Sequence, residues 1–114
     1  MAVEQYRQYI QQILKERVER SRPRPNHPEN EKQLILDTER DHYQIVNVGW
    51  RPNGRRNYGC ILHLDIKNDK IWIQYNGTEE DIAQTLMDLG VPKEDIVLAF
   101  LDRFTRAHTE FAVS

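Results

Sequence analysis

The chain of 114 residues has few of the residue types on which many small proteins depend. It contains one cysteine, Cys60, so it cannot form an intramolecular disulfide, and one thiolate cannot complete a structural zinc site, which needs about four ligands. No apolar run is long enough to cross a bilayer, and the mean hydropathy is -0.78. The N-terminus, MAVEQYRQYI, lacks the basic and apolar regions of a signal peptide. We therefore expect a single cytoplasmic domain with no membrane contact.

Serine and glycine are also scarce, and the chain has no excess of positive charge. The only serines are Ser21 and Ser114, which argues against a Ser-His-Asp triad. The five glycines occur singly, so no glycine-rich loop can cradle a phosphate, and we expect no nucleotide cofactor. The net charge is -2, whereas a protein that binds nucleic acid by itself normally has a clear basic excess. Contact with DNA is therefore expected to be indirect.

Apolar residues at spacings of three and four predict an amphipathic helix over residues 1–20. A proline-rich connector, residues 21–30, follows, because its three prolines interrupt any continuing helix. The helix could fold back on its own sheet or pack against a second chain. The apolar stripe consists of Val3, Tyr6, Ile10, Ile13, Leu14 and Val18.

Strand-like runs separated by turn signals predict an antiparallel sheet of about four strands in a meander. The runs are residues 33–38, 43–50, 58–67 and 70–76. The third connection, Asn68-Asp69, suits a two-residue turn. Alternation in the third run places Cys60 on its apolar face, where we expect a small buried residue, and His63 on the polar one.

The remaining chain predicts helices that cover one face of this sheet. Thr78 is the expected N-cap of a helix that stops at Gly90. Residues 96–101 suit either a strand or a buried helical segment, and we favour a short extended piece followed by a helix over 102–109. The predicted fold class is α+β, with residues 1–114 as one domain in which 31–114 form the sheet and the C-terminal helices.

Charged and imidazole side chains gather within and beside the strand-like runs. Asp65 and Lys67 have the acid-x-lysine spacing of many metal-dependent nucleases, and Asp37 or Asp41 could add a second acid. The histidines with these acids could instead bind a metal, but their spacing does not demand one. We therefore expect no catalytic set and no metal, with the nuclease as the alternative. The possible polar cluster is Asp37, Glu39, Asp41, His42, His63 and Asp65.

Three arginines, Arg51, Arg55 and Arg56, occupy a predicted hairpin tip after Trp50. Aromatic and arginine side chains together can stack bases and grip phosphate, although such residues are also common in cores and on solvated turns. This tip is the expected place for contact with nucleic acid or with a partner. Acids, by contrast, crowd the chain from Glu79 onward, a charge distribution that also suits a protein partner.

Four runs give the chain a distinctive pattern: residues 34–50 (LILDTERDHYQIVNVGW), 59–67 (GCILHLDIK), 70–80 (KIWIQYNGTEE) and 90–98 (GVPKEDIVL). On these runs the chain closely resembles the XisI family, the fdxN element excision controlling factors of nitrogen-fixing filamentous cyanobacteria. The resemblance extends from Tyr6 to Val113.

This resemblance implies an accessory factor that is not an enzyme and that controls site-specific excision of a DNA element during heterocyst differentiation. It implies a XisH-like protein and a site-specific recombinase as partners. A further alternative is a small protein that binds and restrains a XisH-like partner. We also expect a homodimer or higher oligomer, because the amphipathic helix and two tryptophans offer more apolar surface than a small two-layer domain needs.

Overall fold

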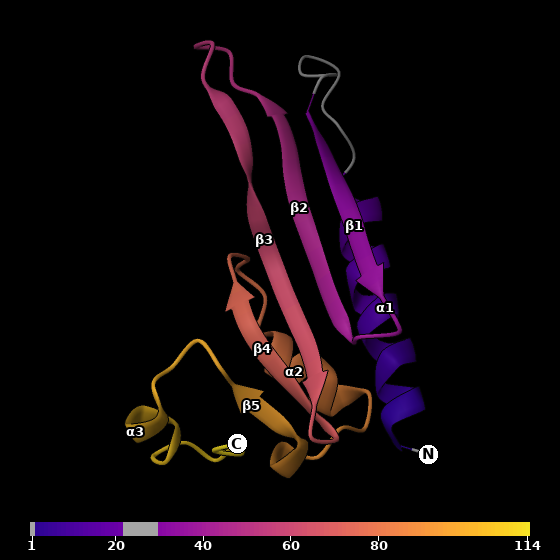
Figure 1. Cartoon of the computed structure of the whole chain (residues 1–114), viewed down its shortest axis with the longest axis vertical. Helices are drawn as coiled ribbons and strands as arrows, with labels where there is room; N and C mark the ends of the chain where they lie inside the picture. The colour runs from indigo at the N-terminus through magenta and orange to yellow at the C-terminus, as the bar shows by residue number, and fades with distance from the viewer. Residues whose placement is uncertain (1, 22–29) are drawn as a thin grey trace.

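An N-terminal helix and a shorter second helix pack behind a twisted five-stranded sheet (Figure 1). The structure is a computed structural model that describes residues 2–21 and 30–114, so most of the predicted proline-rich connector, 21–30, lies outside the described residues. The elements in chain order are α1 (Ala2–Arg20), β1 (Glu31–Asp37), β2 (His42–Trp50), β3 (Arg56–Lys67), β4 (Lys70–Asn76), α2 (Ile82–Asp88), a 3-10 turn (Lys93–Asp95), β5 (Ile96–Leu98) and α3 (Arg103–Arg106).

The strands lie in the order β1-β2-β3-β4-β5. The first four pair antiparallel, which confirms the predicted meander. The prediction of four strands was incomplete, because β5 adds a fifth strand parallel to β4 and makes the sheet mixed. Three residues are too few to show the alternation that identifies a strand, and parallel pairing depends on the α2 crossover that returns the chain to the sheet edge.

The hydrophobic core lies between the sheet and the helices α1 and α2. In α1 the buried residues are Tyr6, Ile10, Ile13 and Leu14, four of the six apolar positions that the sequence placed in one stripe. They pack with Tyr43, Ile45, Leu62 and Leu64 of the sheet and with Ile82 and Leu86 of α2. The sequence left open whether this helix packs on its own sheet or against a second chain, and in the structure it packs on its own sheet.

The local end and turn signals were mostly, but not entirely, interpreted correctly. Asn68 and Asp69 have φ of 55° and 62°, as a two-residue hairpin turn with two left-handed residues requires. Gly90 has φ of 111° and follows α2, which confirms the predicted stop. The predicted N-cap was wrong: Asp81 caps α2 by accepting the Gln84 N–H at 3.1 Å. Thr78 instead donates its hydroxyl to Asn76 within the preceding turn.

The C-terminal helices do not share one face, which corrects the prediction. While α2 packs beside α1, Arg106 of α3 lies over the ring of Trp72, with 5.7 Å from Cζ to the ring centroid. Trp72 lies between Ile71 and Ile73, which point into the helix-side core, so its ring is on the opposite face. The chain end also adds a bridge between Val97 and Ala112. Sequence periodicity could not assign a face to a helix of four residues.

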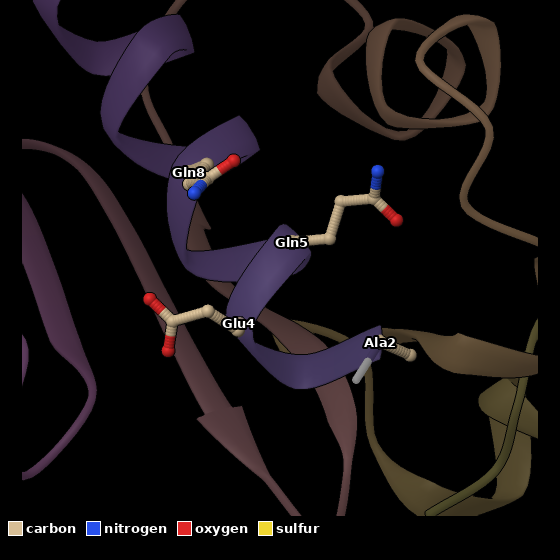
Figure 2. A pocket seen from close by; sticks show the side chains of 4 residues that line it. All are labelled: Ala2, Glu4, Gln5 and Gln8. Atoms are coloured by element: carbon tan, nitrogen blue, oxygen red, sulfur yellow. The ribbon is translucent and has the colours of Figure 1, made fainter.

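The surface of α1 offers no convergent polar site at its start. A shallow hollow there is lined by Ala2, Glu4, Gln5 and Gln8, which are all exposed, and Glu4 and Gln5 point to different sides of the helix (Figure 2). In the part of the chain that the structure describes, no helix is both long and apolar enough to span a membrane.

Replacing Leu14 by alanine tests the packing of α1 on the sheet. Leu14 is fully buried, so the substitution should lower the free energy of unfolding by about 2–5 kcal/mol through reduced burial and a residual cavity. The control is Lys15→Ala at the next, exposed position, which should change stability by less than about 0.5 kcal/mol. Urea denaturation monitored by circular dichroism measures both, and equal stabilities would contradict the packing of Leu14 against the sheet.

Candidate functional site

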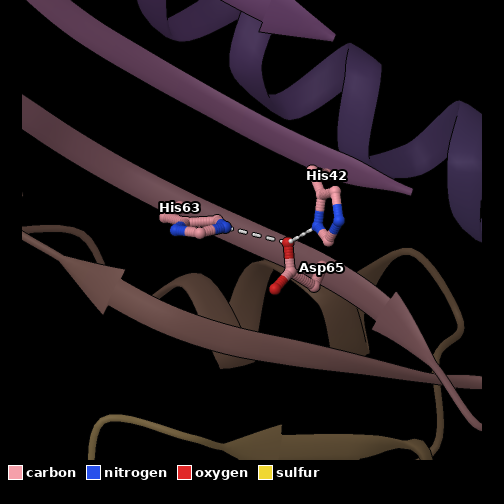
Figure 3. Close-up of side chains that lie close together, drawn as sticks. All are labelled: His42, His63 and Asp65. Carbon is pink, nitrogen blue, oxygen red and sulfur yellow. Dashed lines mark hydrogen bonds and ion pairs between the residues drawn. The ribbon is translucent and has the colours of Figure 1, made fainter. Parts of the chain in front are cut away.

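Two histidines and one aspartate meet on the face of the sheet opposite α1 and α2 (Figure 3). The β2–β3 register sets His42 directly across from Asp65, and His63 precedes Asp65 by two residues, so all three side chains emerge on one face. Oδ1 of Asp65 is 2.9 Å from Nδ1 of His42 and 2.8 Å from Nε2 of His63. A single carboxylate oxygen thus joins two imidazoles.

Two glutamines extend this group along the open face. Gln74 of β4 donates through Nε2 to Oδ2 of Asp65 at 3.1 Å, and Nε2 of Gln44 lies 3.4 Å from Nδ1 of His63. The side chain of Asp65 is 14% exposed, that of His63 is 26% exposed and that of His42 is 56% exposed. The carboxylate is therefore held from three sides, while the imidazoles remain accessible to solvent.

The other acids of the predicted polar cluster perform separate structural tasks in the β1–β2 turn. Asp37 accepts the backbone N–H groups of Arg40 and Glu39, and these bonds lower the pKa of its carboxyl. Glu39 itself is exposed in the turn. The structure thus brings together three of the six predicted residues, and Asp37 and Glu39 lie beside them in the turn rather than bonded to Asp65.

Asp41 is bound to α1 rather than to the histidines. Its two carboxylate oxygens accept from Nε and Nη2 of Arg7 at 2.8 and 3.0 Å, and Oδ1 also accepts the Tyr43 hydroxyl at 2.8 Å. The Arg7 guanidinium, helped by Tyr43, holds the pKa of the Asp41 carboxyl below its usual range. This ion pair fixes the β1–β2 turn against the helix.

The residues considered for a nuclease have separate partners. Asp41 pairs with Arg7, and Asp65 bonds the two histidines. Lys67 lies over the ring of Trp72, with 4.7 Å from Nζ to the ring centroid. The acid-x-lysine spacing therefore reflects two neighbouring positions of a strand whose side chains have different contacts.

The predicted arginine tip belongs to a projecting arm hairpin, which we define as residues 49–60. The last pairs with the neighbouring strands are Val48 with β1 and Leu62 with β4, so the arm hairpin extends beyond both, and Figure 1 shows it past the end of β4. Arg51 and Arg55 close its tip through a backbone bond of 2.8 Å.

Arg56 organises the aromatic residues of the arm hairpin. Its Cζ lies 5.0 Å from the ring centroid of Trp50 and 5.7 Å from that of Tyr58, and Nη1 donates to the carbonyl of Gly49 at 3.1 Å. Trp50 is 49% exposed and Tyr58 is 67% exposed, so the two rings that contact Arg56 are accessible to solvent. Sequence reasoning missed Tyr58, and only its place opposite Val48 in the predicted hairpin could have indicated it.

Comparison with known proteins identifies the family of this chain. The family model described as "XisI protein" matches residues 1–113. The chain belongs to the XisI family. A XisI-like protein from Anabaena variabilis is 39% identical, with a TM-score of 0.90, over 98% of this chain and 99% of the other. The fdxN element excision controlling factor XisI from Anabaena variabilis is 34% identical, with a TM-score of 0.86, over the full length of both chains. Among curated proteins, none matches.

The single thiol of this XisI-family chain, that of Cys60, is exposed, whereas the sequence predicted it on the apolar face of the sheet. Cys60 is exposed in the arm hairpin, because β3 has no β4 neighbour there and a bulge opposite Ile45 and Val46 breaks the alternation of the strand. The expectation that Cys60 is a small buried residue was therefore wrong. A bulge between two apolar runs leaves no clear signal in sequence.

The uneven charge distribution is partly neutralised within the chain. Arg17 and Arg20 of α1 both bond Oε1 of Glu80, at 2.8 and 2.9 Å. These pairs join the basic end of α1 to the acidic segment before α2. None of the ion pairs among the described residues involves Arg51, Arg55 or Arg56, so the arm hairpin keeps its positive character.

Asp41→Asn tests the ion pair at the β1–β2 turn. Asparagine tolerates the left-handed backbone found at Asp41, where φ is 61°, so the change chiefly removes charge. Because the pKa of Asp41 is lower in the folded chain than the unfolded value of about 3.9, its stabilisation is complete above that pH and is lost as the pH falls through the folded value. The thermal midpoint should fall by a few degrees at pH 7, and this difference should vanish in acid.

The matched control is Asp69→Asn, an exposed aspartate with φ of 62° in the β3–β4 turn. Its stability should change little at either pH. Thermal melts of the three proteins at pH 7 and near pH 2.5 make the comparison. A deficit of Asp41→Asn that persists unchanged in acid would show that the charge is not its cause.

Proposed function

We propose that this chain is a non-enzymatic accessory factor that controls site-specific excision of an fdxN-type DNA element during heterocyst differentiation. The observation that carries this proposal is the full-length likeness, at 34% identity, to the fdxN element excision controlling factor XisI. The chain acts through a XisH-like protein and a site-specific recombinase. Its contribution is recognition, since Asp41 and Glu80 bond arginines of α1 in structural pairs rather than converging on a reaction centre.

The arm hairpin is the surface that this role would use. Arginine and aromatic side chains dominate binding hot spots, because they combine a large apolar area with directed hydrogen bonds. Trp50 and Tyr58 are exposed, and both contact the guanidinium of Arg56, so little side-chain freedom is lost on binding. An acidic, hydrophobic surface on a protein partner fits this combination.

Contact with DNA is proposed to be indirect. The net charge of -2 opposes approach to a phosphate backbone at long range, even though the arm hairpin is locally basic. A partner that covers the arm hairpin would also fit the alternative role, in which the chain restrains a XisH-like protein. The two roles differ in whether the partner's DNA binding rises or falls on complex formation.

Replacing Arg51, Arg55 and Arg56 together by alanine tests the arm hairpin. Co-purification with a XisH-like protein should be abolished or strongly reduced, because the charged part of the surface and the cation–π stack both disappear. A control with the same loss of charge replaces three exposed basic residues elsewhere: Lys15, Arg40 and Arg103. This control should still bind the partner.

The same proteins are titrated with DNA over a range of salt concentrations. Removal of one phosphate contact reduces the slope of log affinity against log salt by roughly 0.9, so removal of three direct contacts would flatten it by up to about 3. We expect weak, non-specific binding by the isolated chain that the triple substitution hardly alters. Nanomolar, salt-sensitive DNA binding by the isolated wild-type chain would contradict indirect contact, whatever the co-purification shows.

Self-association is a second part of the proposal. Because α1 packs on its own sheet, the surface for a dimer must lie elsewhere, and β1 ends the sheet with an outer edge that has no strand neighbour among residues 30–114. Edge strands readily pair with one another. Ile35, on this strand, is 46% exposed. Sedimentation equilibrium should show a dimer or higher oligomer, and a monomer at high micromolar concentration would exclude it.

A further inference from the structure

We propose that His42, His63 and Asp65 form a binding site for a zinc ion, a property independent of the excision role. Each residue offers one ligand atom, and the three atoms lie within 4.8 Å of one another. All three come from the paired strands β2 and β3, whose register fixes their Cα positions (Figure 3). A rigid sheet thus presents three donors toward one point above its open face.

The spacing of these donors is close to that of a zinc site. Zinc bonds of about 2.0–2.1 Å in a tetrahedral arrangement place neighbouring ligand atoms roughly 3.3 Å apart. Oδ1 of Asp65 is now 2.9 and 2.8 Å from the two imidazole nitrogens. To bind the ion, Oδ1 must move about 0.5 Å away from each nitrogen, and the two nitrogens, which lie within 4.8 Å of each other, must approach by up to about 1.5 Å. Rotation of the side chains can supply these shifts without movement of the strands.

The donor types select the metal. Two imidazoles and one carboxylate suit zinc and other borderline divalent ions, whereas magnesium and calcium prefer oxygen ligands alone. Three protein ligands leave a fourth position for water. Here that position faces solvent, because the side chain of His42 is 56% exposed.

The neighbouring glutamines supply the outer contacts that orient metal ligands. Gln74 already holds Oδ2 of Asp65, so Oδ1, which now contacts the two imidazoles, is the oxygen that would bind the ion. When Nε2 of His63 binds zinc, its Nδ1 carries the proton and needs an acceptor. Gln44 is 3.4 Å from this nitrogen, and a half-turn of its amide presents the oxygen instead of the nitrogen.

The competing explanation is a hydrogen-bonded trio that only stabilises the β2–β3 pairing. One carboxylate oxygen can accept from two imidazole N–H groups, so the two contacts of Oδ1 fit the trio as well as they fit a metal site. The metal site and the trio make different predictions for added zinc.

Zinc titration of the untagged full chain by calorimetry tests the proposal, with cobalt(II) as a spectroscopic probe. We expect saturable binding of one ion per chain and visible absorption typical of four-coordinate cobalt. His63→Ala and Asp65→Asn should each reduce affinity by more than the roughly 10–100-fold that removal of an outer contact costs, and Gln74→Leu should reduce it within that range.

The matched control is His108→Ala, which removes an exposed imidazole beside Phe104, far from the cluster in sequence. It should bind zinc as the wild type does. Zinc should also raise the thermal midpoint of the wild type and of His108→Ala but not of His63→Ala, because only binding to the folded state stabilises it. Absence of saturable binding, or binding that survives His63→Ala with the variant folded by circular dichroism, would overturn the proposal.

Discussion

The packing of α1 across one face of the sheet is the contact on which the rest of the structure depends. Its four buried residues close the core over β2 and β3, and Arg7 and Arg17 then reach past the core to Asp41 and Glu80. Apolar burial provides most of the stabilisation in such a contact, while the ion pairs at its margin fix orientation. The β1–β2 turn and the entry to α2 are thereby held against one helix.

Because α1 and α2 cover one face, much of the other is free to carry polar groups. An antiparallel sheet allows this division, since alternate side chains point to opposite sides. The cluster of His42, His63 and Asp65 and the arm hairpin both follow from it. The cluster lies where β1, β2, β3 and β4 are all paired, and the arm hairpin lies where β2 and β3 extend beyond β1 and β4. Rigid paired strands position the side chains of the cluster, whereas the arm hairpin is defined by its exposed aromatic rings.

These two surfaces suggest different kinds of recognition within one small domain. The arm hairpin combines Arg56 with two exposed rings, a surface suited to a protein partner. The cluster offers nitrogen and oxygen donors suited to an ion. Nothing in the geometry of the described residues couples them directly, because the bulge at Ile45 and Val46 separates the cluster from the arm hairpin along β2 and β3. Each can therefore be altered without the other.

Most local features, such as helix faces, turns and helix ends, could be predicted from the sequence, because a few nearby residues determine them. The apolar stripe of α1, the Asn68-Asp69 turn and the stop at Gly90 depend on spacing and on φ preferences, which are properties of the sequence itself. The family resemblance was likewise contained in the order of residues. By contrast, the β5 pairing, the face taken by α3 and the exposure of Cys60 depend on register and on a bulge, which arise only when distant strands meet. Register also decided that His42 and His63 share Asp65 while Asp41 turns to Arg7, because a shift of one residue would send each side chain to the other face.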